Sequence, residues 1–234
     1  MMPLGALQPR RVLAIGAHAD DIEIGCGGTL LTLLDCDAAI DLMWVVLTGG
    51  EQRQIEARNS ARAYLDSPAM QVHTPGFEDG YLPHTGREVK RFFESLKAFQ
   101  PDLIFTHTRH DLHQDHRFTN ELTWNTFRDH AILEYEIPKY DGDLAQPNYF
   151  VRLRDEHAQQ KVQLLQTHFA TQRSKHWFSE TLFYGLMRLR GMECHHDGFA
   201  EAFEIGDETG DFNIDGFVNG LDYDAFAEHF EAGC

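Results

Sequence analysis

The chain has 234 residues, of which 42% are hydrophobic and 24% are charged. This composition is globular, and the length suits one sizeable domain with an appendage better than two equal domains. The 37 acidic and 20 basic side chains give a formal net charge of −17. Such a charge repels phosphate backbones and anionic lipid headgroups, so we expect neither nucleic acid nor a membrane as a partner.

The sequence also predicts where the protein resides. No stretch approaches the ~18 apolar residues of a membrane span, and no apolar signal segment precedes the first predicted strand. The four cysteines lie far apart and form no CxxC pair. We therefore expect a reduced, cytoplasmic protein.

Short apolar runs alternate with helical patterns along most of the chain. In chain order, the patterns predict a strand at 12–17, a helix at 29–34, a strand at 40–47, a helix at 54–65, a strand at 70–73, a helix at 88–99 and a strand at 103–106. After residue 130 the pattern loosens, with a strand at 146–153, helices at 156–167 and 180–190, and a last strand at 199–205. This alternation predicts an α/β fold, with a mostly parallel sheet flanked by helices. We expect one catalytic domain over residues 1–205 and a short acidic C-terminal tail over 206–234.

Two clusters of metal-binding side chains follow predicted strands. The first is HADDIE at 18–23, directly after the first strand, and the second is HTRHDLHQDH at 107–116, directly after LIFT. In an open α/β sheet, ligands bind outside the carboxyl ends of the strands, so both clusters converge on one cleft. Two histidines and a carboxylate, with one position left for water, form the ligand set of a hydrolytic zinc site. A second carboxylate beside the ligating one would supply a general base.

The same residues carry a resemblance to a known family. AHADDIEIGCGG closely resembles the AHPDDxExxxGG signature of the PIG-L/LmbE-like zinc N-deacetylases, and HQDH matches their HxDH motif. Weaker matches extend the resemblance over roughly residues 11–205. Ala19 stands where the family usually has proline, a departure that removes no ligand. The resemblance implies a Rossmann-like fold and a catalytic zinc ion held by His18, Asp21 and His116.

The resemblance also implies catalytic roles for three further residues. Asp20 matches the general base, and His113 matches the histidine that stabilises the tetrahedral oxyanion. Asp115 is a candidate partner that fixes the protonation state of His113. The structural alternative is that His18, Asp20 and Asp21 merely cap the following helix.

Two arginines near these motifs are candidate substrate-binding residues. Arg53 lies on the second predicted helix, where it either lines the substrate cleft or forms a solvated ion pair with Glu56. Arg109 lies within the second cluster and is placed to hydrogen-bond a sugar hydroxyl.

These features together predict a zinc-dependent hydrolase that removes an N-acetyl group from a small molecule containing an amino sugar, of the N-acetylglucosamine type. One alternative is an amidase that acts on a larger acyl conjugate, and another is a non-catalytic, metal-stabilised binding module. A His₂Asp site also accepts iron(II), cobalt or manganese. Because cyclic assemblies are common in the family, a homo-oligomer is a further expectation.

The acidic tail resembles a single dockerin-type calcium repeat with the template D-x-[DN]-x-[DN]-G. An acidic terminus without a bound ion is the alternative. The predicted calcium ligands are Asp211, Asn213, Asp215, Phe217 (through its carbonyl), Asn219 and Asp222.

Overall fold

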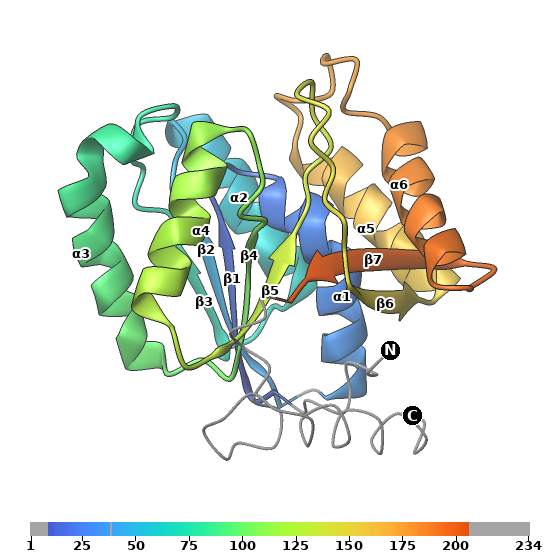
Figure 1. The fold of residues 1–234 in the computed structure, drawn as a ribbon, viewed down its shortest axis with the longest axis horizontal. Coiled ribbons are helices and arrows are strands. Elements are labelled where there is room, and N and C mark those ends of the chain that lie inside the picture. The colour runs from blue at the N-terminus through green and yellow to red at the C-terminus, as the bar shows by residue number, and fades with distance from the viewer. Residues whose placement is uncertain (1–8, 38, 206–234) are drawn as a thin grey trace.

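A seven-stranded sheet organises the computed structural model, which describes residues 9–37 and 39–205 (Figure 1). Its strands are β1 (Arg11–Gly16), β2 (Asp41–Val46), β3 (Met70–His73), β4 (Leu103–His107), β5 (Ala131–Tyr135), β6 (Tyr149–Leu153) and β7 (Phe199–Glu204). The α-helices are α1 (Asp21–Cys36), α2 (Glu51–Tyr64), α3 (Gly86–Leu96), α4 (Gln114–Thr126), α5 (Asp155–His168) and α6 (Glu180–Glu193). Two short 3₁₀ helices are η2 (Leu82–Thr85) and η3 (Lys97–Phe99).

The strand order is β3-β2-β1-β4-β5-β7-β6. The first five strands in this order are parallel, and β7 is antiparallel to both β5 and β6. The chain winds outward from β1 to β3 and then returns to place β4 on the other side of β1. This reversal marks the point where open α/β sheets bind their ligands. The expectation of a mostly parallel α/β sheet flanked by helices is confirmed.

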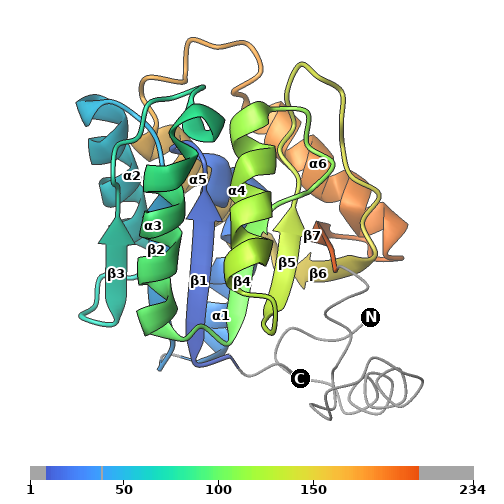
Figure 2. The ribbon, with the colours of Figure 1, turned by 60° about the vertical axis from the view of Figure 1, so that its left-hand side comes forward.

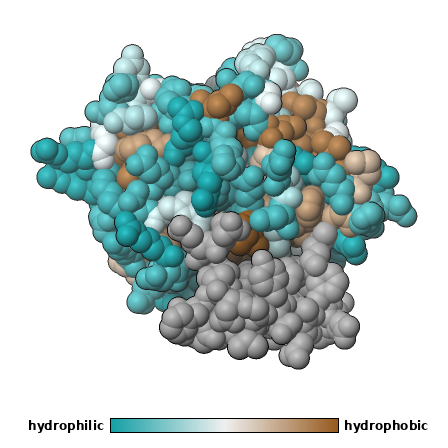
Figure 3. Space-filling view, in the orientation of Figure 1, coloured by the Kyte–Doolittle hydropathy of each residue, from teal (hydrophilic) through white to brown (hydrophobic). Residues whose placement is uncertain are grey.

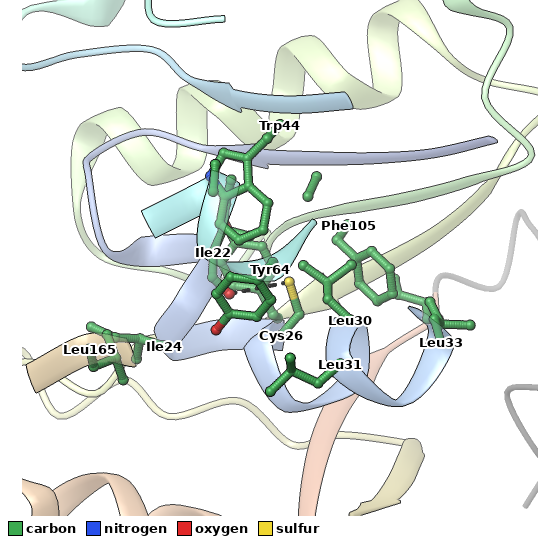
Figure 4. Close-up of a cluster of buried hydrophobic side chains, with 14 of the residues drawn as sticks. Ile22, Ile24, Cys26, Leu30, Leu31, Leu33, Trp44, Tyr64, Phe105 and Leu165 are labelled. Carbon is green, nitrogen blue, oxygen red and sulfur yellow. Dashed lines mark hydrogen bonds between the residues drawn. The ribbon is translucent and has the colours of Figure 1, made fainter. Parts of the chain in front are cut away.

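Helices cover both faces of the sheet (Figure 2). The central strands are buried on both sides, so alternate residues face two separate cores. Ala14 and Trp44 face the core that α1, α2, α5 and α6 share, whereas Leu13 and Val45 face the core under α3 and α4. In the first core, Trp44 and Tyr64 lie beside the α1 residue Cys26 (Figure 4). Polar residues cover most of the surface in Figure 3, and hydrophobic residues gather beside α6.

Helix α1 begins at Asp21, eight residues before the predicted start, because its glycines lie inside the helix. These glycines are packing positions. A Cβ on Gly25 would overlap the Tyr135 ring, and a Cβ on Gly28 would lie 2.5 Å from a Leu153 methyl carbon. The backbone amides of Gly28 and Thr29 also donate to the buried carboxylate of Glu201. The glycines therefore bring α1 close to the sheet.

The patterns did not predict β5 or α4. Strand β5 ends in the polar residue Glu134 and then Tyr135, so its apolar run is short. Helix α4 begins inside the second cluster, at Gln114, where the charged motif conceals the helical pattern. The other predicted elements are confirmed, with ends that differ by a few residues.

Two further expectations concern membrane-spanning helices and the calcium loop. Among the helices in residues 9–37 and 39–205, none combines the length and the apolar character that a membrane crossing needs. The predicted calcium loop lies outside the described residues and stays a prediction.

The close approach of α1 predicts a stability difference between two glycines. Gly25→Ala should lower the free energy of unfolding by about 2–3 kcal/mol, because the Tyr135 ring is held by its hydroxyl bond to Ile15 O and cannot move aside. Gly185→Ala, inside α6, should raise it by about 0.5–1 kcal/mol, because its Cβ would meet no atom within 4 Å. Urea denaturation of both variants measures the pair. Equal effects would show that α1 packs less tightly than described.

Candidate active site

The candidate site lies where β1 and β4 end side by side at the reversal in strand order. His18 follows β1, and His107 is the last residue of β4. The loop after β4 then leads into α4, whose N-cap is His113 and whose first turn carries His116. Residues about 90–100 positions apart in the chain therefore meet at one edge of the sheet.

The three predicted metal ligands form a compact set of donor atoms. His18 Nδ1 lies 3.0 Å from His116 Nε2 and 3.4 Å from Asp21 Oδ2. His116 Nε2 lies 3.5 Å from the same Asp21 oxygen. In a tetrahedral zinc site with bonds of about 2.0–2.1 Å, ligand atoms are separated by about 3.4 Å. The donor set therefore fits a zinc ion in both chemistry and spacing.

His116 is held in the form that a metal ligand requires. Its Nδ1 lies 2.8 Å from Asp111 Oδ2, and Lys139 Nζ lies 3.0 Å from the same oxygen. Burial and the nearby His107 lower the pKa of His116 to about 4, so the ring is neutral. When Nδ1–H donates to Asp111, the lone pair of Nε2 faces His18 and Asp21.

His18 is surrounded by carboxylates. Its Nε2 lies 3.1 Å from Asp79 Oδ1 and 3.4 Å from Asp115 Oδ2, and its backbone N–H donates to Asp21 Oδ2 at 2.7 Å. Burial alone would lower the pKa of His18, but hydrogen bonds to Asp115, Asp21 and Asp79 raise it well above its usual value. Protonated His18 thus places a positive charge among these carboxylates. A metal cation that binds His18 would displace this proton.

Asp21 is ionised despite its burial. The imidazoles of His116 and His107 hold its pKa well below the usual range, against the effect of burial. His107 Nε2 lies 3.1 Å from Asp21 Oδ2, and its ring stacks on His116 with centroids 3.9 Å apart. His107 therefore contacts two of the three candidate ligands, Asp21 and His116.

Asp20, the predicted base, is held in an uncommon conformation. Its φ of 95° lies in the left-handed region, which is rare for a residue other than glycine and concentrates at functional sites. Its Oδ1 lies 3.0 Å from Arg53 Nη2, and Oδ2 has no hydrogen-bond partner among the described residues. Burial raises the pKa of Asp20 to about 7.

His113, the predicted oxyanion stabiliser, has a defined tautomer. Its Nδ1 accepts a hydrogen bond from the backbone N–H of Asp115 at 3.2 Å, which places the ring proton on Nε2. Burial, followed by the neighbouring His18, lowers the pKa of His113, so the neutral ring is a hydrogen-bond donor. The carboxylate of Asp115 has a different task, because it accepts from the backbone N–H groups of Gly80 and Leu82.

These side chains open onto one pocket with a volume of about 390 Å³. Six of the predicted site residues line it: His18, Asp20, Asp21, Arg53, His113 and His116. Three lining residues that the sequence did not point to are Lys139, Lys175 and Trp177. They follow β5 and α5 in irregular segments, where no periodicity or motif singles them out.

The two predicted substrate-binding arginines occupy different places. Arg53 lines the pocket, but its guanidinium is shared among Asp20, the carbonyl of Ala19, and Glu56 at 2.9 Å. The ion pair with Glu56 is therefore present, and it lies inside the cleft rather than in solvent. Arg109 lies outside the pocket lining, where it donates to Glu134 and stacks on Trp124. These contacts make Arg109 a structural partner of β5.

Comparison with known proteins places this geometry in context. Residues 13–127 match the model of the PIG-L family, GlcNAc-PI de-N-acetylase. Diacetylchitobiose deacetylase of Thermococcus kodakarensis is 26% identical over 130 residues, which make up 48% of this chain and 47% of that protein. These matches support the PIG-L/LmbE-like deacetylase family. The chain aligns with about half the length of this curated relative.

Solved structures share the fold. The N,N′-diacetylchitobiose deacetylase of Pyrococcus horikoshii superposes with a TM-score of 0.68 at 22% identity, over 91% of this chain and 89% of that one. A deacetylase of teicoplanin biosynthesis gives 0.65 at 18% identity, over 82% and 96%. The 4-carboxy-2-hydroxymuconate hydratase GalB of Pseudomonas putida gives 0.67 at 14% identity, over 83% and 95%. Because a hydratase shares the fold, the fold alone does not determine the reaction.

The donor geometry predicts which histidine the metal needs. His113 also lies close enough to His18 and His116 to be an alternative third ligand. We expect His116→Ala to weaken zinc binding by more than about 100-fold, because it removes a ligand atom. His113→Ala should leave the zinc affinity within about tenfold of the native value. Calorimetric titration with zinc, together with metal analysis of the purified variants, distinguishes them. Loss of zinc from both variants would instead favour His18, His113 and His116 as the ligand set.

Proposed function

We propose that this protein is a zinc-dependent hydrolase of the PIG-L family that removes an acetyl group from the nitrogen of an amino sugar. One observation carries this proposal: a complete metal-ligand set, a buried carboxylate and a neutral histidine donor line the same pocket. The relatives named diacetylchitobiose deacetylase support the substrate class, an N-acetylated sugar.

The metal would be held by His18, Asp21 and His116. When bound there, zinc supplies a Lewis acid that polarises the amide carbonyl and makes water more acidic. Asp111 and Lys139 fix the orientation of His116 from behind. The remaining chemistry falls to side chains of this chain.

Asp20 acts as the general base. The bond from Arg53 fixes its Oδ1, which leaves Oδ2 available to accept the proton of the attacking water. After the attack, the same carboxyl group returns the proton to the leaving nitrogen. Asp20 suits this second task better than His113, because the only ring proton of neutral His113 is engaged in stabilising the oxygen.

His113 stabilises the developing negative charge. Its Nε2–H is preset by the Asp115 backbone amide and donates to the carbonyl oxygen as that oxygen becomes an anion. Because a donor whose orientation is already fixed needs no reorganisation during the reaction, this interaction strengthens in the transition state.

The direct test is acetate release from a panel of substrates by the zinc-loaded protein. We expect N-acetylglucosamine or its glycosides to yield acetate and free amine in equal amounts. Release only from sugars with longer N-acyl groups would instead identify an amidase for larger conjugates. Bound zinc without turnover of any member would favour the non-catalytic binding module.

The base assignment predicts a large effect of a small change. Asp20→Asn should lower kcat by about 10³-fold, because an amide cannot accept the water proton. The zinc content should match that of the native protein, since asparagine tolerates the positive φ and Asp20 is not a ligand.

The matched control for this prediction is Glu78→Gln, which neutralises an exposed carboxylate near the same pocket. Its kcat should equal the native value. If Asp20→Asn retains more than about a tenth of the native kcat, another group takes the proton.

A further inference from the structure

A second cavity lies beside the catalytic pocket. It has a volume of about 680 Å³ and runs between the loop after β5 and one face of α6, and we call it the side groove. The α6 residues that line it are spaced i, i+3, i+4 and i+7, which places them on one side of the helix. They are Leu182, Gly185, Leu186 and Leu189, and Thr181 adds a polar side chain at the start of the same helix.

The side groove is largely apolar and reaches the surface. Leu144 and Tyr140 form the wall opposite α6, and Tyr140 is 72% exposed. Figure 3 shows hydrophobic residues gathered at this position, beside α6. On a chain with a net charge of −17, an exposed apolar concavity indicates a ligand-binding site.

The side groove adjoins the catalytic pocket. Pro138, Lys139 and Trp177 line both cavities. Lys139 also bonds Asp111, the carboxylate that orients the candidate ligand His116. A molecule that extends from the metal site past Trp177 would therefore reach the side groove.

Gly185 keeps the groove open. A glycine inside a helix lowers stability relative to alanine, so a packing reason is usually found for it. Here there is none, because an added Cβ would meet no atom within 4 Å. The missing side chain instead leaves free volume on the groove face of α6.

We propose that the side groove binds an apolar aglycone, an aryl or alkyl group attached to the amino sugar whose acetyl group is removed. This inference rests on the proposed function. The acetyl group contributes only one methyl beyond the carbonyl, so an apolar group that occupies the groove would come from the other end of the substrate. The concave shape and the size of the cavity fit a small molecule, whereas protein partners bury larger and flatter surfaces.

The test compares the methyl and phenyl β-glycosides of N-acetylglucosamine. In the native protein, kcat/KM should be about tenfold higher for the phenyl glycoside, because the groove removes the ring from water. Gly185→Leu fills the groove with a good helix former and should bring this ratio to about one. Met192→Leu, the matched control, places a leucine at an exposed α6 position outside the groove lining and should keep the native ratio.

Other outcomes would overturn the proposal. A native ratio near one, or a ratio that Gly185→Leu leaves unchanged, would show that the aglycone does not enter the groove. If Gly185→Leu lowers only the turnover of N-octanoylglucosamine, the groove holds an acyl chain. A change of oligomeric state in Gly185→Leu, seen by size-exclusion chromatography, would make the groove a contact between copies of this chain.

A failure of the proposed function gives a separate result. If neither glycoside is hydrolysed, calorimetric titration with the phenyl glycoside still tests the groove. Binding that Gly185→Leu abolishes would support the groove alone, and absence of binding to the native protein would refute it.

Discussion

The pairing of β1 with β4 is the contact on which the candidate site depends. The register places Val12 opposite Leu103 and Ala14 opposite Phe105, so both strands end at the same level. The loop after β1 and the loop after β4 then meet, and His18 reaches His116. Because the chain leaves the sheet in opposite directions from these two strands, no helix fills the space between them. The packing of α1 through its glycines fixes the first loop in place.

Charge balance explains why one carboxylate is left for a cation. The carboxylates of Asp20, Asp21 and Asp111 are all buried, and each needs a positive or hydrogen-bonding partner. Arg53 pairs with Asp20 and Lys139 pairs with Asp111. Within residues 9–37 and 39–205, the polar partners of the Asp21 carboxylate are imidazoles and the His18 backbone N–H. Asp20 and Asp111 thus each have a cationic side chain as partner. Asp21 instead faces two ring nitrogens that can bind a metal together with it.

Sequence patterns predicted those parts of the molecule whose residues are contiguous in the chain. The buried strands and the ligand motifs are contiguous, so His18, Asp20 and Asp21 were found together. The start of α1 was missed because its glycines resemble a loop until the rings that they approach are known. Asp111 and Trp177 were missed for another reason. Their roles depend on which loops the tertiary fold brings together, and no spacing in the sequence encodes that contact.

The candidate metal ligands and the rest of the pocket wall come from different parts of the chain. The donor set lies at the ends of β1 and β4, the elements that define the fold, whereas Lys139 and Trp177 come from irregular segments after β5 and α5. A hydratase and several deacetylases share this fold, so the strand framework tolerates more than one reaction. The irregular segments line both the pocket of the candidate site and the side groove. A substitution at Trp177 would change the wall of the pocket without touching a candidate ligand, whereas a substitution at Lys139 would remove the partner of Asp111, which orients His116.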